Sequence, residues 1–189
     1  MDIDLLKKCG TIVTFQNGQA ICREGEAGHS MFLLLKGEVE ITINSFSDNA
    51  QSLGCMPEGS FFGEMSLLEN KPRSATIVAC SDEVTVLEVS ELDFPNLLLN
   101  ASSITYRLML SLNNRLNNML DRIGIEQEDK KFAYKYRRNP IYSTIQKLDV
   151  RSFDSIAKKD PDYVWELLKY LSSSLEKLNR EYIQRVDEK

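Results

Sequence analysis

The sequence predicts an α+β protein: an antiparallel β jelly-roll barrel with flanking helices, followed by an all-α C-terminal extension. Between residues 11 and 89, short runs of β-forming residues alternate with turn residues, a pattern typical of barrels and jelly rolls. After residue 102, apolar residues recur with helical spacing instead. A chain of 189 residues has room for one good core and an appendage. We therefore expect a barrel domain at 1–101, a helix at 102–124 and a helical extension at 125–189.

The strands of the barrel are expected between turn signals. Asn17-Gly18 ends the first strand, and Pro57-Glu58-Gly59 closes the fifth. Lys36-Gly37 has the form of a compact hairpin turn between the third and fourth strands. The predicted strands cover residues 11–15, 19–23, 31–35, 38–44, 51–56, 73–79 and 84–89.

A short helical turn at 64–68 interrupts the strands, and longer helices follow them. Ser90 suits the N-cap of a short helix that reaches Leu99. Over residues 102–123, apolar side chains are spaced alternately by three and four, as in the seam of a coiled coil. Further apolar residues lie off that seam, so we expect one face to cover the barrel and the seam to form a parallel homodimer. The seam residues are Met109, Leu112, Leu116, Met119 and Ile123.

The C-terminal segment predicts a second long helix. Gly124 suggests a stop for the preceding helix, and Asn139 is disfavoured in a helix because a proline follows it. Pro161, after Asp160, suits the first turn of a long helix. Its apolar residues keep the same spacing, so we expect it to pack against the 102–123 helix or that helix's dimer mate. They are Val164, Leu168, Leu171, Leu175, Leu178 and Tyr182.

The charge argues against a nucleic-acid-binding surface. The net charge is −5, and residues 1–124 carry 9 Lys and Arg against 16 Asp and Glu. Residues 125–189 carry 14 against 12. A local basic run there is interleaved with aromatic residues, but such a run is more typical of a solvated helix face than of an RNA or DNA contact. It comprises Lys130, Lys131, Lys135, Arg137 and Arg138, with Phe132, Tyr134 and Tyr136.

The cysteines and the histidine favour a cytoplasmic protein without a metal. Cys9, Cys22, Cys55 and Cys80 are far apart in the sequence and form no Cys-x-x-Cys pair, so we expect reduced, mostly buried thiols. His29, the only histidine, lies in a glycine-containing turn and has no companion ligands in sequence. No apolar run approaches the length of a bilayer span, and the first residues do not resemble a signal peptide.

Residues 61–77 carry the strongest functional signal. Gly63 and Glu64 open a short apolar turn, and a lone arginine, Arg73, follows among small residues. A buried arginine there needs an anion, and its guanidinium can donate two parallel N–H bonds to a phosphate. Gly63 lets the backbone approach a ligand, and the first N–H groups of the turn favour an anion. Glu64 suits a sugar hydroxyl, and Ser74 can complete the phosphate contact. Together these groups fit a cyclic nucleotide monophosphate.

This segment resembles the phosphate-binding cassette of the cyclic nucleotide-binding domain family. The resemblance rests on Phe62-Gly63-Glu64-Met65-Ser66-Leu67 and Pro72-Arg73-Ser74-Ala75-Thr76 and extends over roughly residues 10–122. The family includes the bacterial catabolite activator protein, the regulatory subunits of protein kinase A and nucleotide-gated channels. The resemblance implies that Arg73 binds the cyclic phosphate and Glu64 the ribose 2′-hydroxyl. It also implies that Gly63, Ser74 and Ala75 line the phosphate and that Phe62, Met65, Ser66 and Leu67 complete the cassette.

The resemblance further implies that the helix after the barrel covers the base. Where the catabolite activator uses hydroxyl side chains to reach adenine, this chain has Met119 and Leu120. Apolar stacking, or hydrogen bonds from Asn117 or Asn118, would replace those contacts, and Arg115 is a further candidate for this end of the ligand.

Ser74 favours cAMP over cGMP. Receptors that prefer cGMP often have threonine at this position, where its hydroxyl reaches guanine, whereas the serine of the catabolite activator contacts phosphate. We therefore expect cAMP as the ligand, with cGMP as the alternative.

Three functions are compatible with these features. The favoured one is a cyclic nucleotide receptor whose ligand shifts the 102–123 helix and so signals to a downstream protein partner. The second is a dimeric transcription regulator of the catabolite activator type, which would need a helix-turn-helix near residues 153–171. The third is an assembly module with a vestigial pocket. An enzyme is not expected, because no nucleophile–base pair, metal cluster or paired carboxylates appear in the sequence.

Overall fold

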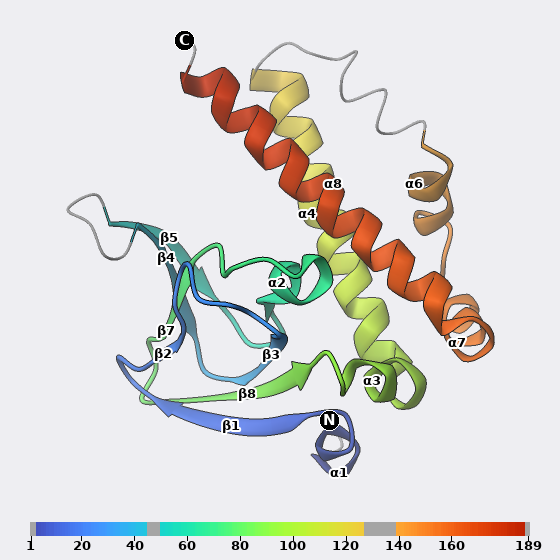
Figure 1. Ribbon diagram of the computed structural model, residues 1–189, viewed down its shortest axis with the longest axis horizontal. Helices are drawn as coiled ribbons and strands as arrows, with labels where there is room; N and C mark the ends of the chain where they lie inside the picture. The colour runs from blue at the N-terminus through green and yellow to red at the C-terminus, as the bar shows by residue number, and fades with distance from the viewer. Residues whose placement is uncertain (1–2, 45–49, 127–138, 188–189) are drawn as a thin grey trace. The chain divides into compact units, whose positions relative to one another are not determined.

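The chain forms two compact units, Met1–Ala101 and Ser102–Lys189. The computed structural model describes residues 3–44, 50–126 and 139–187, and the side chains of 124–126 and 181–187 are also left undescribed. The basic run of residues 130–138 lies outside the described residues, and so does the side chain of Tyr182. Figure 1 shows the strands gathered in the first unit and the long helices in the second.

The first unit contains two four-stranded antiparallel sheets. One has the strand order β1-β8-β3-β6, and the other has the order β2-β7-β4-β5. The strands are β1 Thr11–Gln16, β2 Ala20–Cys22, β3 Ser30–Lys36, β4 Val39–Ile43, β5 Gln51–Met56, β6 Phe61–Phe62, β7 Thr76–Ala79 and β8 Glu83–Ser90. The helices of this unit are α1 Ile3–Lys7, α2 Glu64–Glu69 and α3 Phe94–Asn100. The predicted fold class, antiparallel sheets with flanking helices, is confirmed.

An apolar core joins the two sheets. Its buried members come from both of them: Phe32, Leu34, Phe62, Val84 and Val86 from one sheet, and Cys22, Val39, Ile77 and Ala79 from the other. The rings of Phe32 and Phe62 stack with centroids 5.1 Å apart. This core fixes the edge of the unit at which β3, β6 and the start of α2 come together.

The predicted hairpin at Lys36-Gly37 is wrong. β3 pairs with β8 and β6, whereas β4 pairs with β5 and β7, so the two strands flanking this turn belong to different sheets. Gly37 has φ +86°, and a Cβ there would lie 2.7 Å from the carbonyl oxygen of Glu83. The turn is therefore a corner that carries the chain from one sheet to the other, and local turn chemistry cannot distinguish it from a hairpin.

Two elements begin three residues later than predicted. The strand expected at 73–79 begins only at Thr76, because Arg73 pairs through its backbone with Gly25 and Glu26 instead. The short helix begins at Phe94 with Asp93 as its N-cap, not with Ser90. Ser90 closes the preceding turn, since its hydroxyl accepts a hydrogen bond from the backbone N–H of Asp93 at 3.2 Å.

The second unit is helical. Its elements are α4 Ser102–Glu126, α6 Pro140–Ile145, α7 Val150–Lys159 and α8 Pro161–Asp187. α4 continues through Gly124, so the predicted stop there is wrong. Pro140 begins a helix rather than only breaking one, because the Asn139 side chain caps it by accepting from the N–H of Ile141 at 2.9 Å. The long helix predicted to begin at Pro161 is confirmed.

α4 and α8 lie side by side and run in the same general direction, and α6 and α7 form the return between them (Figure 1). The return segment is tied to α4 by side-chain hydrogen bonds. Tyr106 donates to the Leu148 carbonyl at 2.9 Å, and Gln146 donates to Asn113 at 3.1 Å. At its other end, Ser102 donates to Asp154 of α7 at 2.6 Å.

The apolar stripe of α4 is buried. Leu108, Met109, Leu112, Leu116, Leu120 and Ile123 are fully buried, whereas Met119 is only half-buried. The stripe therefore departs from the predicted seam at Leu120, as a 3.6-residue period requires. On α8, Val164, Leu168, Leu171, Leu175 and Leu178 are buried in turn. α4 packs against α8 and α7 of the same chain, so the predicted packing of the long helices is confirmed, and the stripe assigned to a homodimer is filled within the chain.

The cysteines follow the prediction only in part. Cys9 and Cys22 are buried free thiols, but Cys55 and Cys80 are exposed. These two meet across the sheet with their sulfur atoms 4.0 Å apart, although 25 residues separate them in the sequence. In the described ranges, no helix combines the length and the apolar character needed to cross a bilayer.

Candidate ligand-binding site

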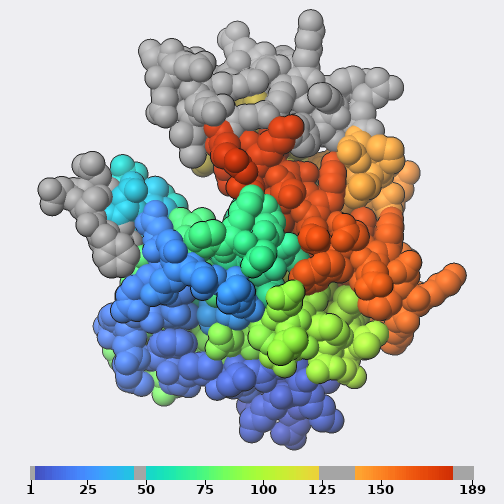
Figure 2. Space-filling model, viewed as in Figure 1, coloured from blue at the N-terminus to red at the C-terminus, as the bar shows by residue number. Residues whose placement is uncertain are grey.

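The backbone of Arg73 is anchored before the β7 strand begins. Its N–H donates to the carbonyl of Glu26 at 2.8 Å, and its carbonyl accepts from the N–H of Gly25 at 2.9 Å. An isolated bridge joins the neighbouring residues Ala27 and Pro72. In Figure 2 the blue surface of the 20–30 segment adjoins the green surface of α2. Backbone hydrogen bonds therefore pair the turn after β2 with the segment before β7, and Arg73 makes two of these bonds.

The side chain of Arg73 is buried, with 7% of its surface exposed. Nη1 donates to the Ser30 carbonyl at 2.6 Å and to the Gly63 carbonyl at 2.9 Å. Nη2 donates to the Ser30 hydroxyl at 3.0 Å, and Cζ lies 5.3 Å from the centroid of the Phe32 ring. These acceptors are all neutral, so the contacts orient the guanidinium without cancelling its charge. Within the described ranges, no carboxylate forms an ion pair with Arg73.

Two donors of Arg73 are left for a ligand. A guanidinium has five N–H groups in one plane, and the described residues accept from two on Nη1 and one on Nη2. The remaining N–H groups, on Nε and Nη2, form a fork of the kind that binds two oxygens of one phosphate. The charge also acts on its surroundings: burial raises the pKa of the Cys22 thiol, and the nearby Arg73 cation opposes that rise.

Two glycines leave room for this arginine. Gly63 has φ +72°, and a Cβ there would lie 2.5 Å from Nη1 of Arg73. A Cβ on Gly28 would lie 2.7 Å from Nε of Arg73 and 2.7 Å from Cβ of Ser66. Real side chains do not tolerate such distances, so glycine is required at both positions for Arg73 to lie where it does.

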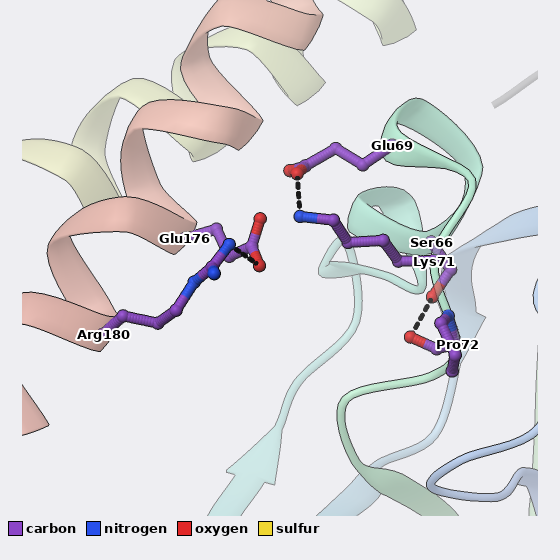
Figure 3. Close-up of polar contacts among 6 residues, drawn as sticks. All are labelled: Ser66, Glu69, Lys71, Pro72, Glu176 and Arg180. Atoms are coloured by element: carbon purple, nitrogen blue, oxygen red, sulfur yellow. Dashed lines mark hydrogen bonds and ion pairs between the residues drawn. The ribbon is translucent and has the colours of Figure 1, made fainter.

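The cassette helix α2 follows Gly63 directly. Glu64, its first residue, is only 2% exposed. Ser66 is also buried, and its hydroxyl donates to the Pro72 carbonyl at 3.4 Å. Just beyond the helix, Lys71 pairs with Glu69 at 2.9 Å. Figure 3 shows both contacts, which tie α2 to the segment that carries Arg73.

The remaining predicted cassette residues divide by burial. Phe62 and Leu67 are buried; Phe62 belongs to the core described above. Ala75 packs against the same core and is half-buried. Met65 is half-buried, and Ser74 is exposed beside Arg73. Of the residues predicted for the phosphate and ribose ends, Arg73 and Gly63 are joined by a hydrogen bond, and Glu64, Ser74 and Ala75 adjoin these two in sequence.

The residues predicted to cover the base belong to the other unit, on α4. Arg115 and Met119 line a groove of about 550 Å³ with residues of α4 and α8. Leu120 is fully buried and has no exposed surface to offer a base. The Asn117 side chain accepts a hydrogen bond from the hydroxyl of Tyr142 within the unit. Arg115 and Asn118 are exposed, and Asn117 and Met119 are half-buried. Of the five residues predicted for the base, Leu120 is therefore the one without the accessible surface that a base contact needs.

Sequence reasoning missed Ser30, Gly28 and Phe32 as neighbours of Arg73. The contacts between Ser30 and Arg73 join residues 43 positions apart, so no local pattern shows them. A usable signal did exist, since an arginine buried without an acid must find neutral acceptors elsewhere.

The comparisons with known proteins agree with this geometry. The family model described as "Cyclic nucleotide-binding domain" matches residues 12–101. A cyclic nucleotide-gated potassium channel of Rhizobium etli is 42% identical over 77 residues, which is 41% of this chain and 20% of the channel. A cAMP-dependent protein kinase regulatory subunit of Colletotrichum orbiculare is 40% identical over 81 residues, covering 43% of this chain and 20% of that protein.

One solved structure is similar as well. A cyclic nucleotide-binding domain from Methylobacillus flagellatus is 28% identical, with a TM-score of 0.50, and the match covers 59% of this chain and 65% of that one. The chain spans about a fifth of the length of the channel and the kinase subunit.

Proposed function

Residues 12–101 belong to the cyclic nucleotide-binding domain family, and we propose that the chain is a cyclic nucleotide receptor that binds its ligand at Arg73. One observation carries the proposal: Arg73 is buried among neutral acceptors with its charge uncompensated in the described contacts. A buried cation is costly unless an anion meets it. A cyclic phosphate bears one negative charge and offers two exocyclic oxygens to the Nε–Nη2 fork.

The ribose end is assigned to Glu64. Glu64 is the first residue of α2 and follows Gly63, whose carbonyl accepts a hydrogen bond from Arg73. An ionised carboxylate accepts from a hydroxyl but repels a phosphate, which suits the 2′-hydroxyl of a ribose. The cyclic phosphate and the ribose are fused in the ligand, so one residue for each suffices to orient it.

cAMP is the proposed ligand, ahead of cGMP. The proposal rests on Ser74, which is exposed beside Arg73 and stands in place of the threonine associated with guanine contact in the family. Named relatives include both a cAMP-dependent kinase subunit and cGMP-dependent kinases, so the ratio of the two affinities is the quantity to measure.

Binding is proposed to act through the helices that follow the domain. A ligand shifts a conformational equilibrium only by its difference in affinity for the two states. The relay therefore requires that nucleotide binding favour one arrangement of α4 and the C-terminal helices, with a protein partner recognising that arrangement. A homodimer would have to use a face of α4 other than its apolar stripe, because α8 and α7 fill that stripe.

The transcription-regulator alternative is not supported by α7 and α8. These helices meet at Asp160, but α8 spans 27 residues and buries its apolar side against α4. A recognition helix instead presents a polar face to the major groove. A salt titration of binding to duplex DNA would test this alternative directly, since phosphate contacts give a steep dependence on salt.

Calorimetry on the full chain tests the proposal. We expect cAMP to bind the wild type, and Arg73→Ala to weaken binding by about a hundredfold or more, because a charge-assisted fork is lost. Arg23→Ala is the matched control: it removes an exposed cation from the neighbouring turn and should change affinity by less than about twofold. A folded wild type that binds neither nucleotide would refute the proposal and leave the assembly module as the alternative.

A further inference from the structure

Ser30 contacts Arg73 twice. It is the first residue of β3 and is 8% exposed. Its carbonyl accepts from Nη1 at 2.6 Å and its hydroxyl accepts from Nη2 at 3.0 Å. Both contacts lie on the edge of the guanidinium that the two Nη atoms form. We propose that Ser30 is a positioning residue that holds this edge and thereby presents the Nε–Nη2 edge of Arg73 to the ligand. The ligand being a cyclic phosphate rests on the function proposed above.

Both partners of this contact are fixed by the fold. Ser30 pairs in register with Ser90 of β8, and the next residue, Met31, is fully buried. Arg73 is held through its backbone to Gly25 and Glu26. The hydrogen bonds between the two residues therefore join two anchored segments, and forming them leaves little further freedom to lose when a ligand arrives.

The Ser30 hydroxyl restricts the orientation of the Arg73 guanidinium in a way that the carbonyls of Ser30 and Gly63 do not. The carbonyls of Ser30 and Gly63 both accept from Nη1, so together they fix one corner of a planar group. The guanidinium can still pivot about that corner. The contact from Nη2 to the Ser30 hydroxyl is a second point of attachment, and two points set the direction of the free edge. The Phe32 ring, 5.3 Å from Cζ, restricts the guanidinium further.

The first test needs no nucleotide. Nitrogen-15 NMR of arginine side chains in the full chain reports whether the Nη protons of Arg73 are distinct and exchange slowly. We expect distinct Nη signals in the wild type and in Ser30→Thr, which keeps a hydroxyl, and averaged signals in Ser30→Ala. Ser90→Ala is the matched control, since it removes a hydroxyl from the paired position, where Ser90 contacts Asp93 instead. Averaged Nη signals in the wild type would overturn the inference.

The second test measures ligand affinity and probes the Nε–Nη2 edge of the Arg73 guanidinium. In the two phosphorothioate diastereomers of cAMP, one or the other exocyclic oxygen is sulfur, a weaker acceptor. We expect the wild type to discriminate between them, and Ser30→Ala to bind cAMP about tenfold more weakly, about 1.4 kcal/mol, with reduced discrimination. A Ser30→Ala variant that keeps wild-type affinity and discrimination would overturn the inference, as would an equal loss in Ser30→Ala and Ser90→Ala.

The two failures are distinguishable. Slowly exchanging Nη signals that depend on Ser30, in a wild type that binds neither cAMP nor cGMP, would refute the proposed function and support the hold of Ser30 on Arg73. A thermal unfolding measurement accompanies each variant. If Ser30→Ala is too unstable to study, Ser30→Cys keeps the size of the side chain while weakening the acceptor, and the same outcomes apply to it.

Discussion

The phosphate end and the base end of the predicted site are built in different ways. At the phosphate end, Arg73 is buried and oriented by neutral oxygens, and glycines leave its space clear. At the base end, α4 uses its apolar residues for packing in its own unit, and Leu120 is one of them. The guanidinium of Arg73 is therefore oriented for the proposed ligand before that ligand binds. Most apolar side chains of α4 are buried in helix packing, so α4 has few of them left to contact a base.

The largest expected effect is on the free energy of unfolding, and it should leave cAMP affinity nearly unchanged. Leu171→Ala removes a fully buried side chain of α8 and should lower the free energy of unfolding by about 3 kcal/mol. Because the phosphate end lies wholly in the first unit, cAMP affinity measured below the unfolding temperature should change by less than about threefold. Lys169→Ala, at a half-exposed position of the same helix, should change stability by less than about 0.5 kcal/mol. An affinity loss as large as that of Arg73→Ala would break the comparison.

Gly63→Ala should have the next largest effect. The left-handed backbone costs an alanine roughly 1–2 kcal/mol, and the new Cβ would also collide with Nη1 of Arg73. We expect a loss of unfolding free energy of about 2 kcal/mol and a loss of cAMP affinity of more than about tenfold. Chemical denaturation and calorimetry measure the two quantities.

Gly18→Ala is the control, because Gly18 has φ +80° but no atom within 4 Å of the place that a Cβ would take. It should show the backbone cost alone and leave affinity unchanged. Equal affinity losses in the two variants would mean that the space around Arg73 does not matter for binding.

The role of Glu64 is sharpened by changing the ligand. 2′-Deoxy-cAMP lacks the proposed partner of this carboxylate, so the wild type should bind it about tenfold more weakly than cAMP, the value of one hydrogen bond to a charged group. Glu64→Gln, which keeps an acceptor oxygen but loses the charge, should retain only part of this preference for cAMP. A full preference for cAMP that survives in Glu64→Gln would place the ribose contact elsewhere.

The smallest effect is expected at the base end. Met119→Ala should change the cAMP to cGMP affinity ratio by about threefold or less, since a half-exposed stacking contact is worth little. Leu120→Ala should leave that ratio unchanged but destabilise the chain by about 3 kcal/mol, because Leu120 is fully buried. A larger shift of the ratio in Leu120→Ala than in Met119→Ala would reverse the assignment.

Short-range pattern predicted much of the molecule. The alternation of strands and turns predicted the fold class, and the helical spacing of α4 and α8 predicted their mutual packing. Pattern failed where a distant partner decides. The residues of the turn at Gly37 are typical of a hairpin, but β3 pairs with β8 and β4 pairs with β7, so the two strands beside the turn do not pair with each other. The spacing of apolar residues likewise does not show whether the helix that packs against them belongs to the same chain or to a second copy.

The site shows the same division. Gly63, Glu64 and Arg73 could be proposed together because they lie in one stretch of sequence, and a hydrogen bond joins Arg73 to the Gly63 carbonyl. Ser30, the other acceptor of Arg73, could not be proposed from local sequence, because it reaches Arg73 through the pairing of β3 with β8 and β6. Asn117 and Leu120 were assigned to the base from their helix position, and tertiary packing within the second unit engages both of them instead.

A crystal structure of the full chain with cAMP would test the central claim most directly. We predict that Nε and Nη2 of Arg73 lie within hydrogen-bond distance of the two exocyclic phosphate oxygens, while Nη1 keeps the carbonyls of Ser30 and Gly63. A phosphate bound elsewhere, or an Arg73 that leaves Ser30 to meet its ligand, would contradict the account.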